Sequence, residues 1–336
     1  MTTVIRRRRP LVALLSGFAL LVSACSAGQG PANAAAVVNG KTITVDRVQE
    51  LVEKAVKAEP AVQAMADQRK LDLLSRGVLR QLILHELIAA YSAKESLTID
   101  PAQVTELSKQ LAEPTPLPTD GSATADMIVS QAVNRVVDPN ELARDYLSLA
   151  QIGFKQAAGL AVTIDYSFVS GGAEGAEGAP ANAGSLREKA FEKARQMATS
   201  LDEASKIIEA DIKVDNQSAE KNRTFAPAQA PDLAGSVLFG APVNSVVAFQ
   251  PNPQQAGWVV AVIRKRDLSA TPDPKAPEVD VRLATTLGPR LLQATAQEFG
   301  VKLSPRYGVW DFSDMSVAPN DGETKGLVLA IKNATP

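Results

Sequence analysis

Residues 37–48 read Val-Val-Asn-Gly-Lys-Thr-Ile-Thr-Val-Asp-Arg-Val, and the prediction for the whole chain is organised around this stretch. Val37 and Val38 are β-branched and favour a strand. Asn39-Gly40 is the dipeptide that most readily adopts positive φ at both central positions of a tight turn, and Ile43 lies in a second extended run. The stretch therefore predicts a strand, a tight turn, a second strand and the start of a helix.

The residues that follow carry the periodicity of amphipathic helices. Thr44 or Asp46 can cap a first helix, and apolar side chains recur after it at helical spacing. A longer helix is predicted within residues 67–94, with apolar side chains around much of its circumference. This breadth requires burial on several sides, by other helices or in part by a bound apolar peptide. The candidate client groove combines apolar side chains of both helices: Leu51, Val52, Leu74, Val78 and Leu82.

Two separated segments carry a family resemblance. The opening Val38-Asn39-Gly40-Lys41-Thr42-Ile43-Thr44, followed by two helices, resembles the N-terminal module of SurA-like periplasmic chaperones, and of the PrsA and PpiC foldase lipoproteins. The segment Pro305-Arg306-Tyr307-Gly308, with Trp310 after it, resembles the end of actinobacterial SurA-like lipoproteins. The resemblance implies that a C-terminal helix and strand pack on the N-terminal module. We expect Leu327–Ile331 to pair with Ala36–Val38. Tyr307 and Trp310 are expected to be core anchors, with client contact as the alternative.

The first 24 residues have the three parts of an export signal. Four arginines, Arg6–Arg9, precede an apolar run that ends in small residues. The sequence Val22-Ser23-Ala24-Cys25 resembles a bacterial lipobox, which implies cleavage between Ala24 and Cys25 after diacylation of the cysteine sulfur. Two acyl chains suffice for stable anchoring. We therefore expect a lipid-anchored protein on the extracytoplasmic face of the cell membrane. An ordinary secretory signal with an incidental cysteine is the alternative.

Composition limits the chemistry that the chain can perform. Aromatic residues make up 4% of the chain and its formal net charge is -2, which argues against nucleic acid as a partner. With Cys25 as the only cysteine and His85 as the only histidine, we expect no metal site of imidazole and thiolate ligands, and no cofactor. His85 is expected to be partly buried with a satisfied partner, and a proton switch is the alternative.

The middle of the chain alternates strands and helices. Ala161–Val169 alternates apolar and polar residues like a strand, Ser185 and Ser200 open two helices, a polar loop is expected through Arg223, and further strands follow. This order is similar to that of the parvulin type of prolyl isomerase domain. Parvulins carry histidines in their first and last strands, whereas the corresponding strands here have none. Ser167 offers one hydroxyl, and we name no catalytic residue.

The predicted fold class is α+β: a mainly helical SurA-like N-terminal chaperone module, completed by the C-terminal helix and strand, with an inserted parvulin-like α/β domain. The predicted boundaries follow composition and periodicity. They are a signal peptide (1–24), a tether (25–36), the helical module (37–113), a linker (114–127), a connecting helix (128–160), a degenerate parvulin-like domain (161–267), a linker (268–280), and the C-terminal helix and strand (281–336).

The resemblance implies a non-catalytic chaperone, or holdase, whose partners are unfolded or nascent exported polypeptides and, through acylated Cys25, the lipid bilayer. Enzymatic activity is not expected, because the strands lack the histidines of the isomerase family. Two alternatives stay open. One is an active prolyl isomerase of the parvulin type. The other is a scaffold or adaptor lipoprotein of the cell envelope.

Overall fold

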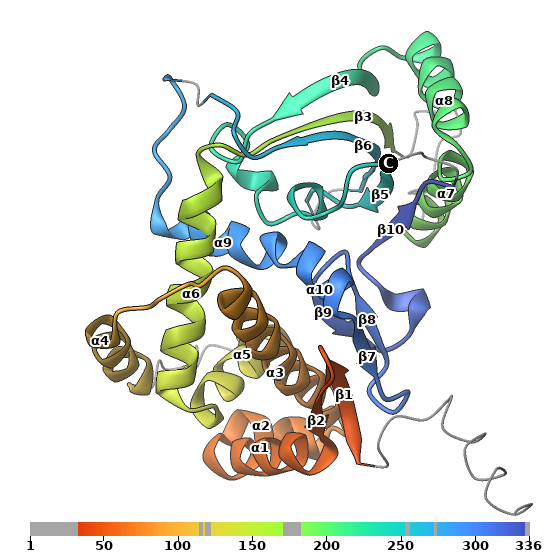
Figure 1. Cartoon of the computed structure of the whole chain (residues 1–336). Coiled ribbons are helices and arrows are strands. Elements are labelled where there is room, and N and C mark those ends of the chain that lie inside the picture. The colour runs from red at the N-terminus through yellow and green to blue at the C-terminus, as the bar shows by residue number, and fades with distance from the viewer. Residues whose placement is uncertain are drawn as a thin grey trace, which may run out of the picture. The chain divides into compact units, whose positions relative to one another are not determined.

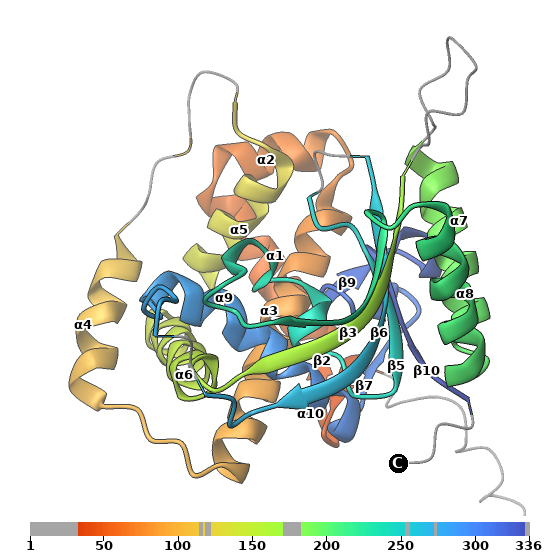
Figure 2. The same cartoon turned by 90° about the horizontal axis from the view of Figure 1, so that it is seen from above.

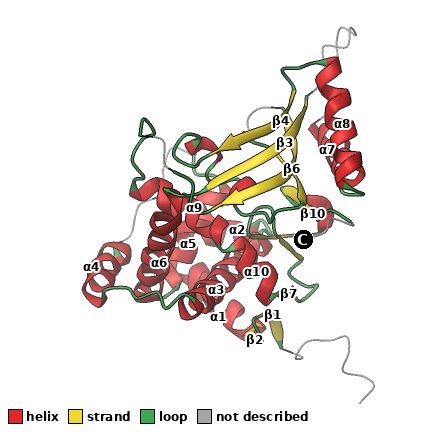
Figure 3. Cartoon of the chain, turned by 45° about the horizontal axis from the view of Figure 1, so that its top comes forward, coloured by secondary structure: helices red, strands yellow, loops and turns green. Residues whose placement is uncertain are grey.

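The computed structural model describes residues 33–113, 117, 122–170, 183–252, 256–271 and 274–332. The chain from Asn33 onward forms one compact unit. Helices and strands are mixed, which is compatible with the predicted α+β class. Figure 3 shows the helices α1 to α6 and α9 grouped together beside the strands β3, β4 and β6. Within the described residues, none of the helices has both the length and the apolar character needed to cross a bilayer.

The N-terminal corner is confirmed. Strands β1 (Ala34–Val38) and β2 (Lys41–Thr44) pair antiparallel, and the turn residues Asn39 and Gly40 have φ angles of 49° and 76°. The Thr44 hydroxyl accepts a hydrogen bond from the backbone N–H of Arg47 at 3.1 Å and so caps helix α1 (Val45–Ala58). The local signals of the sequence therefore predict this corner correctly.

Five further helices follow, and the connecting segment differs from its prediction. They are α2 (Pro60–Asp67), α3 (Leu71–Lys94), α4 (Pro101–Ala112), α5 (Ala125–Val136) and α6 (Pro139–Ala157). The predicted single connecting helix over 128–160 is two helices, and α5 begins inside the predicted linker, where Thr124 caps it. Because Pro139 has no N–H to continue α5, it begins α6 instead, behind the Asp138 cap.

The α/β part contains a five-stranded antiparallel sheet with the strand order β10-β5-β6-β3-β4. Its elements are β3 (Ala161–Val169), α7 (Ala183–Met197), α8 (Leu201–Val214), β4 (Ala219–Phe225), the short 3₁₀ helices η1 (Pro231–Leu233) and η2 (Val237–Phe239), β5 (Ser245–Phe249), β6 (Trp258–Asp267) and β10 (Gly326–Ala330). The polar loop expected through Arg223 is wrong, because β4 lies there. This strand is at the sheet edge, where charged side chains are tolerated and apolar alternation is not required.

Both faces of this sheet are covered. Helices α7 and α8 pack on one face, where their buried side chains meet Val246, Val260 and Val262. The opposite face belongs to the large core cluster, which includes Ile164 and Phe249 of the sheet together with residues of η2, α9 and the N-terminal helices. Figure 2 shows α7 and α8 on one side of the strands and the remaining helices on the other. The predicted helical module and the α/β part therefore share a continuous core.

The C-terminal segment returns to the N-terminal corner by a different strand from the one predicted. Its elements are α9 (Val281–Leu291), α10 (Gln293–Phe299), β7 (Val301–Leu303), β8 (Val309–Asp311), β9 (Ser316–Ala318) and η3 (Asp321–Glu323). Figure 1 shows β7 beside β1, and their register places Val301 opposite Val38. The predicted pairing of Leu327–Ile331 with Ala36–Val38 is wrong. Since β7 occupies that edge of β1, β10 instead extends the larger sheet beside β5.

Helices α6 and α9 cross closely through two glycines. A Cβ atom added at Gly153 of α6 would lie 2.0 Å from the backbone oxygen of Ala284 in α9. One added at Gly288 of α9 would lie 2.5 Å from the backbone oxygen of Leu149 in α6. Only glycine permits backbones to approach this closely. The crossing ties the C-terminal return to the helix that enters the sheet.

Candidate functional site

Three of the five residues of the predicted client groove lie in the core. Leu51, Leu74 and Val78 are fully buried in the core. Val52 and Leu82 are partly buried and pack against the same core. Helix α3 is apolar around much of its circumference because α1, α5, α6 and the β1 strand all pack on it. The sequence showed this breadth but could not show that the chain itself covers it.

A concave site instead lies on a different side of α3. This α3–α5 cleft has a volume of about 570 Å³. Its walls come from α3, from α5 and from the segment of β8, β9 and η3. The lining residues are Leu73, Arg76, Gly77, Arg80, Gln81, Asp126, Val129, Ser130, Val133, Asn134, Asp311, Asp314, Ser316, Val317, Ala318, Pro319, Glu323 and Lys325. Gly77 brings α3 close to α5, since its added Cβ would lie 2.4 Å from Cγ1 of Val129.

Ionic contacts hold the β8–β9 wall of the cleft. The Asp311 carboxylate is buried and accepts hydrogen bonds from the backbone N–H groups of Ser313 (2.8 Å) and Lys325 (2.6 Å). The Asp314 carboxylate lies 3.0 Å from Nζ of Lys325 and 3.7 Å from Nη2 of Arg290. Arg290 of α9 also donates to the Ser313 carbonyl at 2.7 Å. These contacts fix the wall relative to α9 and keep the cleft preformed.

At one end of the cleft, a polar network joins α3 to α6. Gln81, which lines the cleft, donates to the Asp145 carboxylate at 3.2 Å, and Nδ1 of His85 lies 2.9 Å from the same carboxylate. This hydrogen bond raises the pKa of His85, against the opposing effect of burial. The prediction of a partly buried histidine with a satisfied partner is confirmed.

The two segments on which the sequence resemblance rests approach each other through the strand pair of β1 and β7. Val38 and Ile43 are buried in the core near the strand pair of β1 and β7. After β7, the turn of Pro305, Arg306 and Tyr307 reaches α1 and α3, where Arg306 and Tyr307 line a second cleft of about 470 Å³ with Val52 and Arg76. Arg76 lines both clefts, so they adjoin along α3.

Tyr307 and Trp310 lie where core anchors were expected, and the close packing beside them requires glycine at position 308. Tyr307 and Trp310 are buried, as predicted for core anchors. Gly308 has a φ of 111°, and an added Cβ would lie 2.0 Å from the backbone oxygen of Ala318. Ala24 and Cys25, the predicted cleavage and lipidation positions, lie outside the described residues.

Ser167 does not have the surroundings of a nucleophile. Its side chain is 2% exposed, and its hydroxyl donates to the Asp211 carboxylate at 2.7 Å. Nζ of Lys193 lies 3.0 Å from the Ser167 oxygen but 2.7 Å from the same carboxylate. The amine nearest to the hydroxyl is therefore engaged with the Asp211 carboxylate rather than placed as a separate general base. This trio links β3 to α7 and α8.

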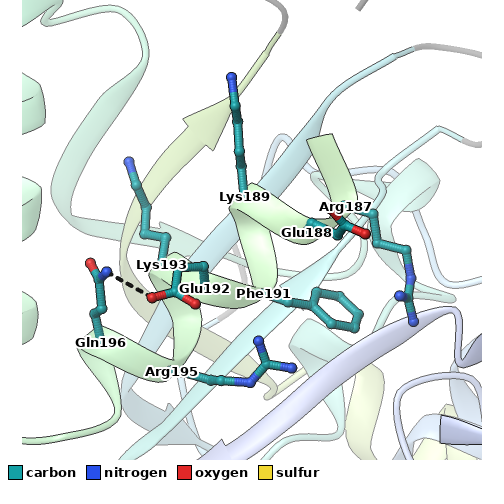
Figure 4. Close-up of a pocket in the computed structure, with 8 residues that line it drawn as sticks. All are labelled: Arg187, Glu188, Lys189, Phe191, Glu192, Lys193, Arg195 and Gln196. Carbon is teal, nitrogen blue, oxygen red and sulfur yellow. Dashed lines mark hydrogen bonds between the residues drawn. The ribbon is translucent and has the colours of Figure 1, made fainter. Parts of the chain in front are cut away.

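Another depression, of about 540 Å³, lies over α7. Its polar side chains do not point toward a common centre. All of its lining residues come from this one helix. In Figure 4, Lys189 and Lys193 extend away from Phe191 and Arg195, and the contact drawn joins Gln196 to Glu192. Phe191 is buried against the ring of Trp258, with ring centroids 5.4 Å apart. The residues around this depression serve packing and solvation.

Neither the described metal-binding side chains nor a comparison with known proteins identifies a further site. Over the described ranges, no group of three or more His, Cys, Asp or Glu side chains is placed to hold a metal ion. Comparison with models of protein families, with curated proteins and with solved structures found no match to this chain. Sequence reasoning missed the α3–α5 cleft. The available signal was Arg80-Gln81, a polar pair inside the apolar run of α3.

Proposed function

We propose that the protein is a membrane-anchored extracytoplasmic lipoprotein that acts as a non-catalytic chaperone for unfolded exported polypeptides. In this proposal the α3–α5 cleft binds an extended segment of the client. The cleft is the observation that carries the proposal. Its volume of about 570 Å³ lies within the range of roughly 300–1,000 Å³ that is usual for binding pockets.

The lining of the cleft suits a polypeptide of variable sequence. Apolar side chains of Leu73, Val129 and Val317 can bury client side chains without selecting one of them. Polar groups of Ser130 and Asn134, together with charges of both signs, can bond to a peptide backbone and its polar side chains. A holdase requires this combination, because it must bind many unfolded chains with modest affinity.

The arrangement of the two ends of the chain supports a SurA-like architecture as part of the proposal. Strand β7 pairs with β1, and the Arg306-Tyr307 turn packs beside α1 and α3. The N-terminal helices are thus completed by the C-terminal segment, with the α/β part between them in sequence. Cys25 would carry the lipid, and the predicted tether of residues 25–36 would be shorter, because β1 begins at Ala34.

The isomerase alternative has less support. Catalysis of rotation about an X–Pro bond must lower a barrier of roughly 20 kcal/mol, which requires an open pocket around the twisted amide. Here the sheet is packed on both faces, and Ser167 is buried in its contact with Lys193 and Asp211. No observation in the structure favours the scaffold alternative over the chaperone.

Light scattering from an unfolded client tests the proposal. The chain from residue 25 onward with Cys25→Ser would be added at near-equimolar ratio to a dilute client during refolding. We expect suppression of aggregation for several unrelated clients. No suppression for any client, together with one stoichiometric partner in pull-downs, would favour the scaffold. Accelerated proline-limited refolding at catalytic ratios would favour the isomerase.

A further inference from the structure

The five-stranded sheet ends in β4 on one side and in β10 on the other, and these two edge strands differ in how they are protected. β4 carries the charged residues Glu220, Lys221 and Arg223. Asn222 beside them has a φ of 57°, which interrupts the extended backbone. Charges and local distortions of this kind keep an edge strand from pairing with other chains. β10 reads Gly-Leu-Val-Leu-Ala and has no charge, proline or positive φ, so this edge of the sheet is unprotected.

β10 is open on the side that faces away from β5. Its five residues pair with Ser245–Phe249 of β5, and within the described part of the chain no strand pairs with its other side. Figure 2 shows β10 at the end of the row formed by β3, β6 and β5. All five residues of β5 are buried, whereas Leu327, Val328 and Leu329 of β10 are partly exposed and Ala330 is exposed. The edge of β10 is therefore accessible to another chain.

The register identifies the backbone groups that point to this open side. The Ile331 N–H donates to the Asn244 carbonyl at 3.0 Å, and these two residues continue the register of β10 and β5. Hydrogen-bonded and non-hydrogen-bonded pairs alternate along an antiparallel ladder. Every second residue counted back from Ile331 therefore bonds to β5, whereas the N–H and C=O groups of Val328 and Ala330 point away from β5.

The open strand begins where the α3–α5 cleft ends. Glu323 and Lys325 line the cleft, and Gly326 directly after them is the first residue of β10. The Lys325 N–H donates to the buried Asp311 carboxylate at 2.6 Å, so the cleft wall holds the start of the strand. A polypeptide that leaves the cleft at this end meets the edge of the sheet.

We propose that the edge of β10 binds an extended apolar segment of the client by strand addition, next to the segment held in the cleft. This inference rests on the proposed function and adds a second contact to it. Strand addition takes its affinity from main-chain hydrogen bonds, which every polypeptide can form, so it suits clients of unrelated sequence. The partly exposed side chains of Leu327, Val328 and Leu329 favour a client segment without charges.

The length of the edge favours a client over a second copy of the chain. The five residues of β10 extend over about 17 Å. A stable interface between two folded proteins needs roughly 20–30 residues on each side, so the pairing of two β10 edges does not supply a stable dimer. A client that also occupies the cleft needs only a few further hydrogen bonds. The edge is likewise too short to hold a client without the cleft.

Hydrogen exchange with two matched peptides, followed residue by residue by NMR, tests strand addition. Both probes are short uncharged peptides of alternating Val and Ser, and one of them carries N-methyl groups on its consecutive central amides. The methyl groups remove the hydrogen-bond donors from both edges of the peptide and leave its side chains in place. At about ten times its dissociation constant, the unmodified peptide should slow exchange of the Val328 and Ala330 amides about tenfold. The N-methylated peptide should leave their exchange unchanged.

Two variants of one residue separate the open edge from the fold of the strand. Val328→Pro removes a donor that points away from β5, a position where an edge strand tolerates proline, and it should abolish the protection of Ala330 by the unmodified peptide. Val328→Thr is the matched control, because it keeps the N–H and nearly the same shape, and it should retain the protection. The N-methylated peptide gives the same test on the unmodified chain, independently of whether Val328→Pro folds.

Three results would overturn the inference. One is exchange at Val328 and Ala330 that neither peptide slows. Another is equal protection by both peptides. The third is protection in the free chain that disappears on dilution, which would assign the edge to a second copy. Light scattering with unfolded clients keeps the proposed function separate: a chain that suppresses aggregation without any protection of β10 retains that function and loses only the second contact, whereas a chain that suppresses no aggregation loses both.

Discussion

Substitution of Gly153 by alanine tests the contact that joins the C-terminal return to the rest of the fold. The added Cβ would lie 2.0 Å from the backbone oxygen of Ala284, whereas ordinary contacts begin at 3.4 Å. Because the obstacle is backbone, it cannot rotate away as a side chain would. Helices α6 and α9 would have to move apart by about 1 Å, which disturbs a close-packed core.

The expected change in the free energy of unfolding is the difference between two opposing effects. Overpacking of a core costs typically 1–3 kcal/mol, and a backbone obstacle places this substitution toward the upper end. Replacing glycine by alanine inside a helix stabilises it by roughly 1 kcal/mol. We expect Gly153→Ala to lower the free energy of unfolding by about 1–2 kcal/mol. The midpoint of thermal unfolding should fall by roughly 2–5 °C.

Urea unfolding followed by the fluorescence of Trp258 and Trp310, both buried, measures this change. Gly184→Ala is the matched control, since it lies in helix α7 and its added Cβ would meet nothing within 4 Å. That control should be neutral or slightly stabilising. The effects of Gly153→Ala and Gly288→Ala should add incompletely in the double variant, because the first already separates the helices. A Gly153→Ala chain as stable as the original would refute the close crossing.

Three further predictions concern other parts of the chain. Gly308→Ala should destabilise the protein by about 2 kcal/mol or more in urea unfolding, because Gly308 has a φ of 111° and a Cβ there would meet the Ala318 oxygen. For His85, the Asp145 hydrogen bond raises the pKa in the folded state above the unfolded value of about 6.5, so the stabilisation is complete below that pH and is lost as the pH rises through the raised value. The stability difference between the original chain and His85→Asn should therefore shrink as the pH rises above about 6.5, and a pH-independent difference would contradict this. Cys25→Ser should shift the protein from the membrane fraction to the soluble fraction of the native host, and an unchanged distribution would contradict lipid anchoring through that sulfur.

Local signals in the sequence predicted most of the individual elements. The Asn39-Gly40 turn and the Thr44 cap depend only on residues a few positions apart, and the structure contains both. Strand β3 was predicted with its observed bounds, because its apolar side chains alternate. Strand β4 was missed because an edge strand with charged side chains has no such alternation.

Long-range pairing could not be predicted in the same way. Both Val301–Leu303 and Leu327–Ile331 are suited to the free edge of β1, and nothing in their composition decides between them. The hydrophobic periodicity of the sequence did not indicate the cleft either. Periodicity selected the most apolar side chains of α3, which the core buries, whereas the cleft uses more polar positions such as Arg80 and Gln81. A binding surface on a packed helix is found where the apolar pattern is interrupted.

The central claim is that unfolded chains bind in the α3–α5 cleft, and the most direct measurement is a comparison of two tryptophan substitutions. Asn134→Trp places a large side chain in the cleft, at an exposed position of α5. Asn216→Trp places the same side chain at an exposed position between α8 and β4, outside the cleft. Suppression of client aggregation, followed by light scattering, should be lost in Asn134→Trp and retained in Asn216→Trp. Equal suppression by both variants would contradict the assignment of the cleft as the client site.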